Sequence, residues 1–578
     1  MHQCLPGECQ PPCSRAHDVK QDINLRTVNG KLVAIWSAFP DKEAIVFYDD
    51  NDEKVSLTNR QVRSLSEKCA SLLRSCGVHK GDVVCNLLPG SMEREITNFG
   101  ILLAGAVVML GGNITERNPH FWEPIRQSRA RYLIVDPSKD SPAWGMLKDD
   151  LEASNADIER STNKEIPLVE KVFKFRIEHL IPASGRDSVK SAFDLIRQHE
   201  GTYSEKVYAH DPAAIYVCKC KQQKHYKLVL RNQYTLVQIG HRVEDMFGLH
   251  SQDIIYNDWP LSWISGLPFA YFTVGTTMVK STLINCSAQK VVVHTWDLIV
   301  KEKCTVASLH PPMIQMLTSH CEDIPEPHWR LRLLTTTGFV SQSAMDAIGP
   351  VTESIAVCYS LIEAGIVSRL IVTAATATQY TEGCVGDMAN TIRTKFDTSS
   401  KTAAKATKMG EILLQGKLVA KEYYNDPNLT KVAFTPDQFL LTGDLGFYDE
   451  NNRLFVLGRK MDAIIRGDTA IFPRDIEEKV NQCPGIWKVK VVSIKDDKGI
   501  IQMCACVIPR SHDSLTIDRV KEFCRYQLGG TYDDDKNPHM PSYVFFFEDF
   551  PVLKGKVNRR MLAFMASEII HGNPTFEY

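Results

Sequence analysis

Four short turn sequences of the chain place a charged side chain beside glycine or hydroxyl residues. Residues 442–444 are Thr-Gly-Asp, residues 458–459 are Gly-Arg, residues 555–556 are Gly-Lys, and residues 359–363 are Tyr-Ser-Leu-Ile-Glu. A carboxylate accepts two hydrogen bonds, a guanidinium is a fixed cationic fork and a lysine is a compact mobile charge. Such groups can hold a hydroxylated or phosphorylated ligand. Each sequence alone is weak, because Thr-Gly-Asp is usually a polar turn and Gly-Lys a surface loop.

The segments that must position these turns alternate between helices and strands from about residue 25 to 455. Apolar residues recur at helical spacing over 60–76, whereas 82–88, 131–135 and 213–217 are short, bounded apolar runs typical of strands. Strands that alternate with helices predict an α/β fold with parallel-rich sheets covered by helices.

Three further stretches complete this part of the chain. The apolar runs 100–112 and 266–279 contain glycines and are shorter than the roughly 20 residues of a membrane span, so they predict buried helix or strand. The stretch 137–207 is polar and rich in lysine, serine and aspartate, so we expect connections and surface helices there rather than core.

After residue 462 the pattern changes to that of a small α+β domain. An amphipathic helix is predicted over 515–528, with Ile517, Val520 and Phe523 on its apolar side. Strands are predicted at 489–494, 500–508 and 542–547.

The bulk composition is that of an ordinary globular protein of at least two domains. The chain has 578 residues, of which 44% are hydrophobic and 24% charged, and its formal net charge is -2. This net charge gives no indication of a nucleic-acid-binding surface, so no nucleic-acid partner is predicted.

The cysteines and the chain ends favour an intracellular, cytoplasmic protein. Seventeen cysteines are scattered without a disulfide framework, and the polar N-terminal residues lack a signal-peptide core. The C-terminal residues differ from the Ser-Lys-Leu peroxisomal tripeptide. Cys4, Cys9 and Cys13 are possible metal ligands, but no partner group follows at zinc-finger spacing, and a flexible tail over 1–24 is the preferred interpretation.

Taken in chain order, the turn sequences resemble the signatures of the adenylate-forming superfamily, which includes acyl-CoA synthetases, 4-coumarate-CoA ligases and luciferase-like enzymes. The matching segments are 359–363, 383–386 (Gly-Cys-Val-Gly), 410–424, 442–444, 458–464, 473–477 (Pro-Arg-Asp-Ile-Glu) and 555–559 (Gly-Lys-Val-Asn-Arg). Their order and spacing across about residues 30 to 570 make the resemblance specific where each motif alone is not.

The resemblance implies a ligase with two half-reactions. A small carboxylic acid, fatty or aryl, attacks the α-phosphate of ATP to give an acyl-adenylate and pyrophosphate, and coenzyme A then displaces AMP; Mg²⁺ assists. It also implies a large N-terminal domain over 25–457, a hinge at 458–462 that includes Met461 and Asp462, and a small C-terminal domain over 463–578.

The resemblance assigns the nucleotide-binding residues. Asp444, with Thr442, matches the position that holds the ribose hydroxyls, and Arg459 matches the arginine near ribose and phosphate. Tyr359 and Ser360 match the segment that lies against the adenine. The simpler alternatives are a turn-capping aspartate, an interdomain salt bridge and a core aromatic residue.

The resemblance also assigns two catalytic residues. Glu363 matches the glutamate that holds Mg²⁺, for which hard oxygen ligands are suited. Lys556 matches the lysine of the C-terminal domain that stabilises charge on the α-phosphate, although the spacing from Pro551 is one residue short. The alternative for Lys556 is a solvated lysine in a basic tail.

The phosphate-binding loop departs from the family pattern. The family has Tyr-Thr-Ser-Gly-Thr-Thr-Gly-x-Pro-Lys-Gly, whereas residues 217–227 are Val-Cys-Lys-Cys-Lys-Gln-Gln-Lys-His-Tyr-Lys. Tyr226 takes the place of the lysine, and a loop without glycine cannot readily adopt the positive-φ turns that let backbone amides converge on an anion. The lysines that remain as point charges are Lys219, Lys221, Lys224 and Lys227. We therefore predict impaired handling of ATP.

Smaller departures affect other sites. Ser360 replaces a glycine, Met461 replaces a lysine, and Asp468 occupies a glycine position. Trp263, followed by Gly266, replaces the histidine of a His-x-x-Gly sequence in the acyl pocket.

Three functions remain open. An acyl-CoA ligase that tolerates the altered loop is favoured by Glu363, Asp444, Arg459 and Lys556. A non-catalytic protein that binds nucleotide or acyl-CoA is favoured by the loop. Oxygenation of an adenylated substrate, as in luciferase, ranks last because it still requires the adenylate.

Overall fold

The protein divides into two compact units in the computed structural model. The first comprises Met1–Ile392 and Gly416–Gln438, and the second Arg393–Gln415 and Phe439–Tyr578. Residues described by the structure are 25–48, 53–111, 121–138, 141–150, 158–161, 163–166, 168–177, 191–219, 226–259, 268–281, 288–320, 329–338, 340–398, 409–466, 469–495, 499–510, 515–529, 537–553 and 556–571. The predicted tail with Cys4, Cys9 and Cys13 lies outside them, and the predicted domain boundaries stay predictions.

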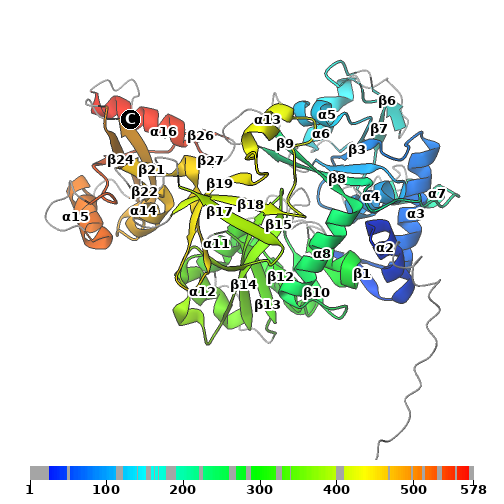
Figure 1. Cartoon of the computed structure of the whole chain (residues 1–578), viewed down its shortest axis with the longest axis horizontal. Coiled ribbons are helices and arrows are strands. Elements are labelled where there is room, and N and C mark those ends of the chain that lie inside the picture. Colours follow the sequence, from blue (N-terminus) through cyan, green and yellow to red (C-terminus); the bar gives the residue numbers. More distant parts are fainter. Residues whose placement is uncertain are drawn as a thin grey trace, which may run out of the picture. The chain divides into compact units, whose positions relative to one another are not determined.

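The first sheet of the first unit has seven strands in the order β6-β7-β5-β3-β4-β8-β9. Figure 1 labels five of them, β3 and β6 to β9. Its central strands are parallel, and β6 and β9 are antiparallel edges. The strands are β3 (Val83–Asn86), β4 (Val107–Leu110), β5 (Tyr132–Val135), β6 (Ile158–Arg160), β7 (Lys171–Lys174), β8 (Pro212–Lys219) and β9 (Tyr226–Asn232).

The second sheet of this unit runs in the order β16-β15-β14-β13-β12-β10-β11-β1-β2. From β1 through β14 its inner strands are parallel, and the hairpins β1–β2, β14–β15 and β15–β16 are antiparallel. The strands are β1 (Glu43–Tyr48), β2 (Lys54–Thr58), β10 (Ile254–Asn257), β11 (Thr277–Ser281), β12 (Val306–Ser308), β13 (Leu333–Thr337), β14 (Ser354–Leu361), β15 (Gly365–Thr373) and β16 (Cys384–Met388).

Helices cover both sheets of this unit. A capping box of Thr58 and Gln61 starts α3, and Asn232 caps α8, which ends at the left-handed Gly248. The helices are α2 (Val28–Ala38), α3 (Asn59–Ser75), α4 (Met92–Leu103), α5 (Glu123–Ser128), α6 (Pro142–Leu147), α7 (Ala192–Gln198), α8 (Gln233–Phe247), α9 (Phe269–Val274), α10 (Ala288–Lys301), α11 (Pro311–Ser319), α12 (Gln342–Ile348) and α13 (Pro427–Ala433).

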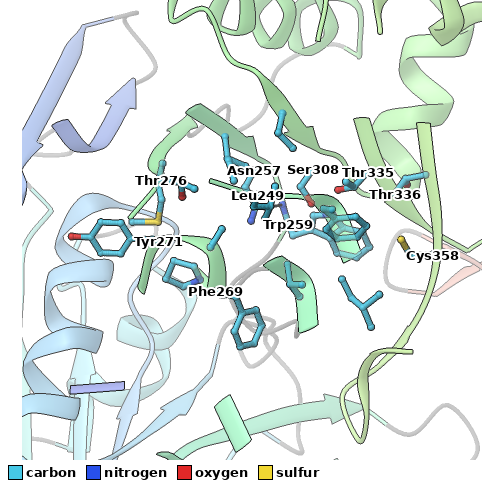
Figure 2. A pocket seen from close by; sticks show the side chains of 18 of the residues that line it. Leu249, Asn257, Trp259, Phe269, Tyr271, Thr276, Ser308, Thr335, Thr336 and Cys358 are labelled. Atoms are coloured by element: carbon cyan, nitrogen blue, oxygen red, sulfur yellow. Dashed lines mark hydrogen bonds between the residues drawn. The ribbon is translucent and has the colours of Figure 1, made fainter. Parts of the chain in front are cut away.

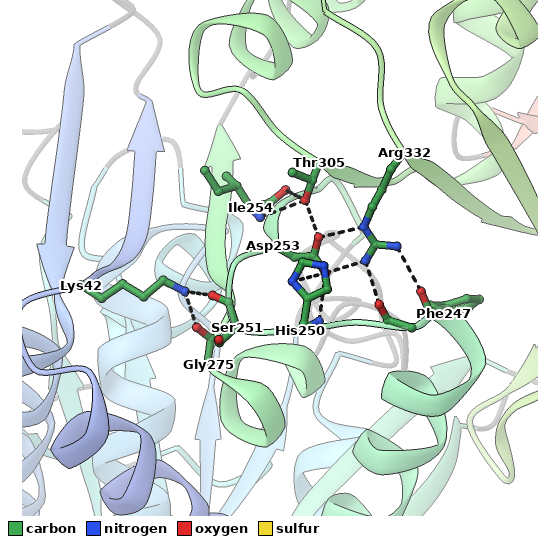
Figure 3. Close-up of polar contacts among 10 residues, drawn as sticks. Lys42, Phe247, His250, Ser251, Asp253, Ile254, Gly275, Thr305 and Arg332 are labelled. Atoms are coloured by element: carbon green, nitrogen blue, oxygen red, sulfur yellow. Dashed lines mark hydrogen bonds and ion pairs between the residues drawn. The ribbon is translucent and has the colours of Figure 1, made fainter.

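An ion pair with a buried carboxylate joins the N-terminal ends of β10 and β13, the parallel strands on either side of β12 (Figure 3). Arg332, just before β13, donates through Nε (2.9 Å) and Nη2 (2.5 Å) to Asp253, just before β10, whose side chain is fully buried. Thr305 donates to the same carboxylate at 2.6 Å, and the backbone N–H of His250 at 3.0 Å. Burial alone would raise the pKa of Asp253, but these hydrogen bonds hold its pKa below the usual value.

The second unit contains the antiparallel strands β18 (Gly410–Gly416), β19 (Leu440–Tyr448) and β20 (Leu454–Arg459), with β17 (Ile392–Asp397) beside β18. Its other sheet, β23-β24-β25, is buried on both faces. The remaining elements are β21 (Ile464–Arg466), β22 (Thr469–Ile471), α14 (Pro473–Val480), β23 (Ile486–Lys495), β24 (Ile501–Pro509), α15 (Ile517–Leu528), β25 (Tyr543–Phe546), β26 (Val552–Leu553), β27 (Lys556–Val557) and α16 (Arg559–Ile570).

The structure confirms the predicted α/β class and corrects two details. The stretch 137–207 contains β7, which pairs with β5 inside the first sheet, and Phe173 and Phe175 are fully buried there. The run is too short among polar residues to have predicted a core strand. On α15 the buried residues are Val520 and Cys524, while Ile517 is 39% exposed.

Within the described residues no helix combines the length and the apolar character that crossing a membrane requires. The intracellular, cytoplasmic location stays a prediction.

Candidate functional site

The altered loop connects two paired strands of the first unit. In the β8–β9 hairpin Lys219 faces Tyr226, and Cys218 faces Lys227. Lys221 and Lys224 lie outside the described residues. The replaced sequence 217–227 therefore begins in β8 and ends in β9, and these two strands pair with each other.

Alternation along β9 sends neighbouring side chains to opposite faces of the sheet. Tyr226 is 2% exposed and packs with Leu228 in the apolar cluster of α5 and α6. Val229 belongs to the cluster on the other face, which also contains Tyr423. Tyr226, which stands in the place of the family lysine, is therefore part of the core. Lys227, one position later, points to the opposite face of the sheet, which it shares with Val229.

Lys227 meets Glu363 and Tyr423 on this face. Its ammonium lies 3.9 Å from Oε1 of Glu363 and 3.3 Å from the hydroxyl of Tyr423, and 5.1 Å from the centre of the Tyr423 ring. The Tyr423 hydroxyl donates to the same Oε1 at 2.6 Å. Glu363 is 7% exposed, and the negative charge of its buried carboxylate is balanced by the Tyr423 hydroxyl and the Lys227 ammonium.

Backbone contacts hold these three side chains in place. Arg231, also on β9, donates to the carbonyls of Ile362 (2.5 Å) and Leu418 (2.8 Å). The N–H of Ala420 donates to the carbonyl of Glu363 at 2.7 Å, and that of Tyr424 to Leu228 at 2.7 Å. Burial lowers the pKa of Arg231 to about 10.

The predicted adenine segment lies at the end of β14. Tyr359 is 7% exposed, and Ser360 is half-buried. The register against β15 shifts between these two residues. A β-bulge changes the direction of the side chains at the end of a strand, and such bulges are frequent next to active sites.

The predicted ribose-binding residues meet in the second unit. Asp444 and Arg459 are opposite each other on β19 and β20, with Arg459 Nε 3.0 Å from Asp444 Oδ1. Arg459 Nη1 donates to the carbonyl of Thr442 at 3.0 Å, and the Thr442 hydroxyl accepts from the N–H of Asp444 at 3.1 Å. Gly443 between them has φ +74°, which favours glycine. Arg459 is thus paired with Asp444 within this unit.

The predicted hinge and catalytic lysine also belong to this unit. Met461 is 39% exposed, and Asp462 is exposed beside it. Sequence reasoning missed Lys460, whose ammonium lies 2.9 Å from the buried carboxylate of Glu411. Lys556 lies on β27 opposite Leu553. The roles of these residues stay predictions.

An apolar pocket of the first unit was not predicted in its extent, because distant segments build it. Helices α8 and α9 supply apolar walls, including Val243 and Phe269, and the strand ends supply polar groups such as Asn257 and Thr336 (Figure 2). Cys358, the neighbour of Tyr359, closes one side. Trp263 and Gly266, the predicted acyl-pocket residues, lie outside the described residues.

Among the described residues no three His, Cys, Asp or Glu side chains gather to hold a metal ion. The role of Glu363 as a magnesium ligand stays a prediction from the family resemblance, and its partners in the structure are the hydroxyl of Tyr423 and the ammonium of Lys227.

Comparison with known families decides the assignment. The profile described as "AMP-binding enzyme" matches residues 34–216 and 223–424. The chain belongs to this family of AMP-binding enzymes. The match is interrupted between residues 216 and 223, in the hairpin that carries the altered loop.

Individual relatives are distant but cover most of the chain. A mitochondrial medium-chain acyl-CoA ligase of Bos taurus is 24% identical over 559 residues, covering 93% of this chain and 87% of the relative. A 4-coumarate–CoA ligase of Oryza sativa subsp. japonica is 25% identical over 493 residues, covering 82% of each chain. The crystal structure of an anthranilate CoA ligase in complex with anthranoyl-AMP superposes with a TM-score of 0.73 at 18% identity, covering 94% of this chain and 98% of that one. The AMP-binding fold is thus shown.

Proposed function

We propose that the chain is an acid–thiol ligase of the acyl-CoA synthetase type in which adenylate handling is kept and handling of the ATP phosphates is impaired. The observation that carries this proposal is the contrast between the apolar pocket beside β14 and the glycine-free sequence of residues 219–225. The printed names of the relatives, medium-chain acyl-CoA ligase and 4-coumarate–CoA ligase, support a carboxylic acid and coenzyme A as substrates.

The pocket favours an acid with a largely apolar body. Its walls are mostly aliphatic and aromatic, with hydroxyl and amide groups confined to the strand ends. Lys280 on β11 also lines it, but Glu95 neutralises this ammonium at 2.5 Å. A second carboxylate on the substrate would therefore find no uncompensated charge at Lys280.

Two covalent steps make up the proposed reaction. A carboxylate oxygen of the acid bonds to the α-phosphorus of ATP while the bond to pyrophosphate breaks. The thiol sulfur of coenzyme A then bonds to the acyl carbon, AMP leaves with the electron pair, and the thiol proton passes to solvent. Only the first step needs a group that holds the β- and γ-phosphates, and that group is what the hairpin has lost.

Supplying the adenylate ready-made separates the two steps. With synthetic octanoyl-AMP and coenzyme A, we expect thioester formation about 100-fold faster than with octanoate, ATP and Mg²⁺, because the phosphate cradle is bypassed. Chromatography of octanoyl-CoA, corrected for the reaction without protein, measures both rates. Equal rates from both starting points would show that ATP handling is intact.

Matched variants test whether the pocket holds the acyl group. Val243→Phe adds bulk to the pocket wall and should slow thioester formation from octanoyl-AMP at least about tenfold. Val432→Phe makes the same exchange at a site that is 69% exposed on α13 and should leave the rate unchanged.

The altered hairpin also favours a second function, a non-catalytic protein that binds AMP or an acyl-CoA. In that case octanoyl-AMP and coenzyme A give no thioester above background, while either ligand still raises the melting temperature of the protein.

A further inference from the structure

The carboxylate of Glu363 already has a cation beside it. Its Oε1 accepts from Tyr423 at 2.6 Å and faces the ammonium of Lys227 at 3.9 Å. A magnesium ion demands oxygen ligands at about 2.1 Å in near-octahedral geometry. An ion bound to this carboxylate would lie within a few ångströms of the ammonium, and the two positive charges would repel.

Lys227 has several favourable contacts in this position. Its side chain is 25% exposed and that of Glu363 is 9% exposed, so water screens their interaction only partly. The ring of Tyr423 lies 5.1 Å from the ammonium, a favourable cation–π contact. The family loop pattern described above ends in a glycine at the position of Lys227.

Within this hairpin the backbone leaves the lysine little choice of face. Residues 226 and 228 pack in the apolar cluster, and β9 is paired with β8 along its length, so residue 227 must point to the side of Glu363. The residues present do not suit the divalent cation that the family resemblance implies.

We propose that the ammonium of Lys227 occupies the place beside Glu363 that a magnesium ion would take, and that this chain binds no divalent cation there. The inference rests on the proposed function, since the family role of Glu363 is what links it to a metal. Its physical basis is the geometry of Lys227, Glu363 and Tyr423 alone.

Terbium luminescence tests the proposal without nucleotide or turnover. Tb³⁺ takes oxygen ligands as Mg²⁺ does, and a tyrosine beside it sensitises its emission; Tyr423 is in hydrogen-bond contact with Glu363. The full-length protein is titrated as wild type, Glu363→Gln, Lys227→Met and Lys227→Arg. Met removes the charge at similar length, and Arg keeps it.

The wild type and Glu363→Gln should give the same emission, because no ion binds at Glu363. Lys227→Met should gain an additional emission component whose affinity for Tb³⁺ is at least about tenfold higher than that of the wild type. This component should be absent from Lys227→Arg and from the double variant Lys227→Met/Glu363→Gln. Wild-type emission that Glu363→Gln removes would overturn the proposal. So would a folded Lys227→Met that gains nothing.

The comparison of wild type with Glu363→Gln decides the matter even if Lys227→Met does not fold. Thioester formation from octanoyl-AMP needs no metal at this carboxylate. Failure of the ligase proposal therefore shows in that assay, and failure of the metal proposal shows in the luminescence.

Discussion

Replacing residues 219–225 with Ser-Gly-Thr-Thr-Gly-Ser-Pro should raise the affinity for ATP about 100-fold, because two restored charge-assisted hydrogen bonds supply about 3 kcal/mol. The replacement covers the hairpin tip and leaves Tyr226 in its apolar cluster and Lys227 beside Glu363. Glycines let successive backbone N–H groups turn toward one anion, which the present sequence of the tip disfavours. Calorimetry with ATP and with AMP measures the effect.

The control for this exchange is Ser-Ala-Thr-Thr-Ala-Ser-Pro over the same residues. It keeps the length, the hydroxyls and the proline and removes only the backbone freedom, so ATP affinity should stay near that of the wild type. AMP affinity should change little in either variant, because AMP has no β- and γ-phosphates. An equal gain from both replacements would show that hydroxyls, not backbone amides, are what the loop lacks.

The second large effect concerns stability. Asp253→Asn should lower the free energy of unfolding by roughly 3 kcal/mol, because Arg332 is left partly buried without its counter-charge. Urea unfolding at neutral pH measures the change. The matched control is Asp41→Asn, whose pair with Arg60 is 79% and 65% exposed, and it should cost less than about 0.5 kcal/mol.

The same pair gives a pH dependence of defined sign. The pKa of Asp253 is lowered from 3.8 in the folded state, so its stabilisation is complete above that value and is lost as pH falls through the folded pKa. The stability difference between wild type and Asp253→Asn should therefore shrink in acid below about pH 4. A difference that grows in acid would contradict this assignment of charges.

Hydrophobic periodicity predicted much of the framework, whereas the roles of the site residues stay predictions. The predicted helix at 60–76 and the strands at 131–135 and 213–217 match α3, β5 and β8, because strong periodicity survives in a single sequence. Strand β7 was missed because its apolar run is short and stands between polar residues, and only the neighbouring β5 makes it core.

The altered loop shows what sequence alone could not resolve. The missing glycines at 219–225 were visible, and they predicted a changed phosphate site. That Lys227 reaches Glu363 depends on strand register and on the backbone of 418–424, which packs between β9 and the Glu363 turn. The apolar pocket likewise depends on segments far apart in the chain, and no local pattern marks it.

Calorimetric titration of the wild-type chain with AMP and, separately, with ATP and Mg²⁺ tests the central claim most directly. If adenylate handling is kept and phosphate handling impaired, AMP binds with measurable affinity, and ATP binds at least about tenfold more weakly. ATP with Mg²⁺ binding more tightly than AMP would contradict the account, since it would require a working phosphate cradle at the hairpin tip.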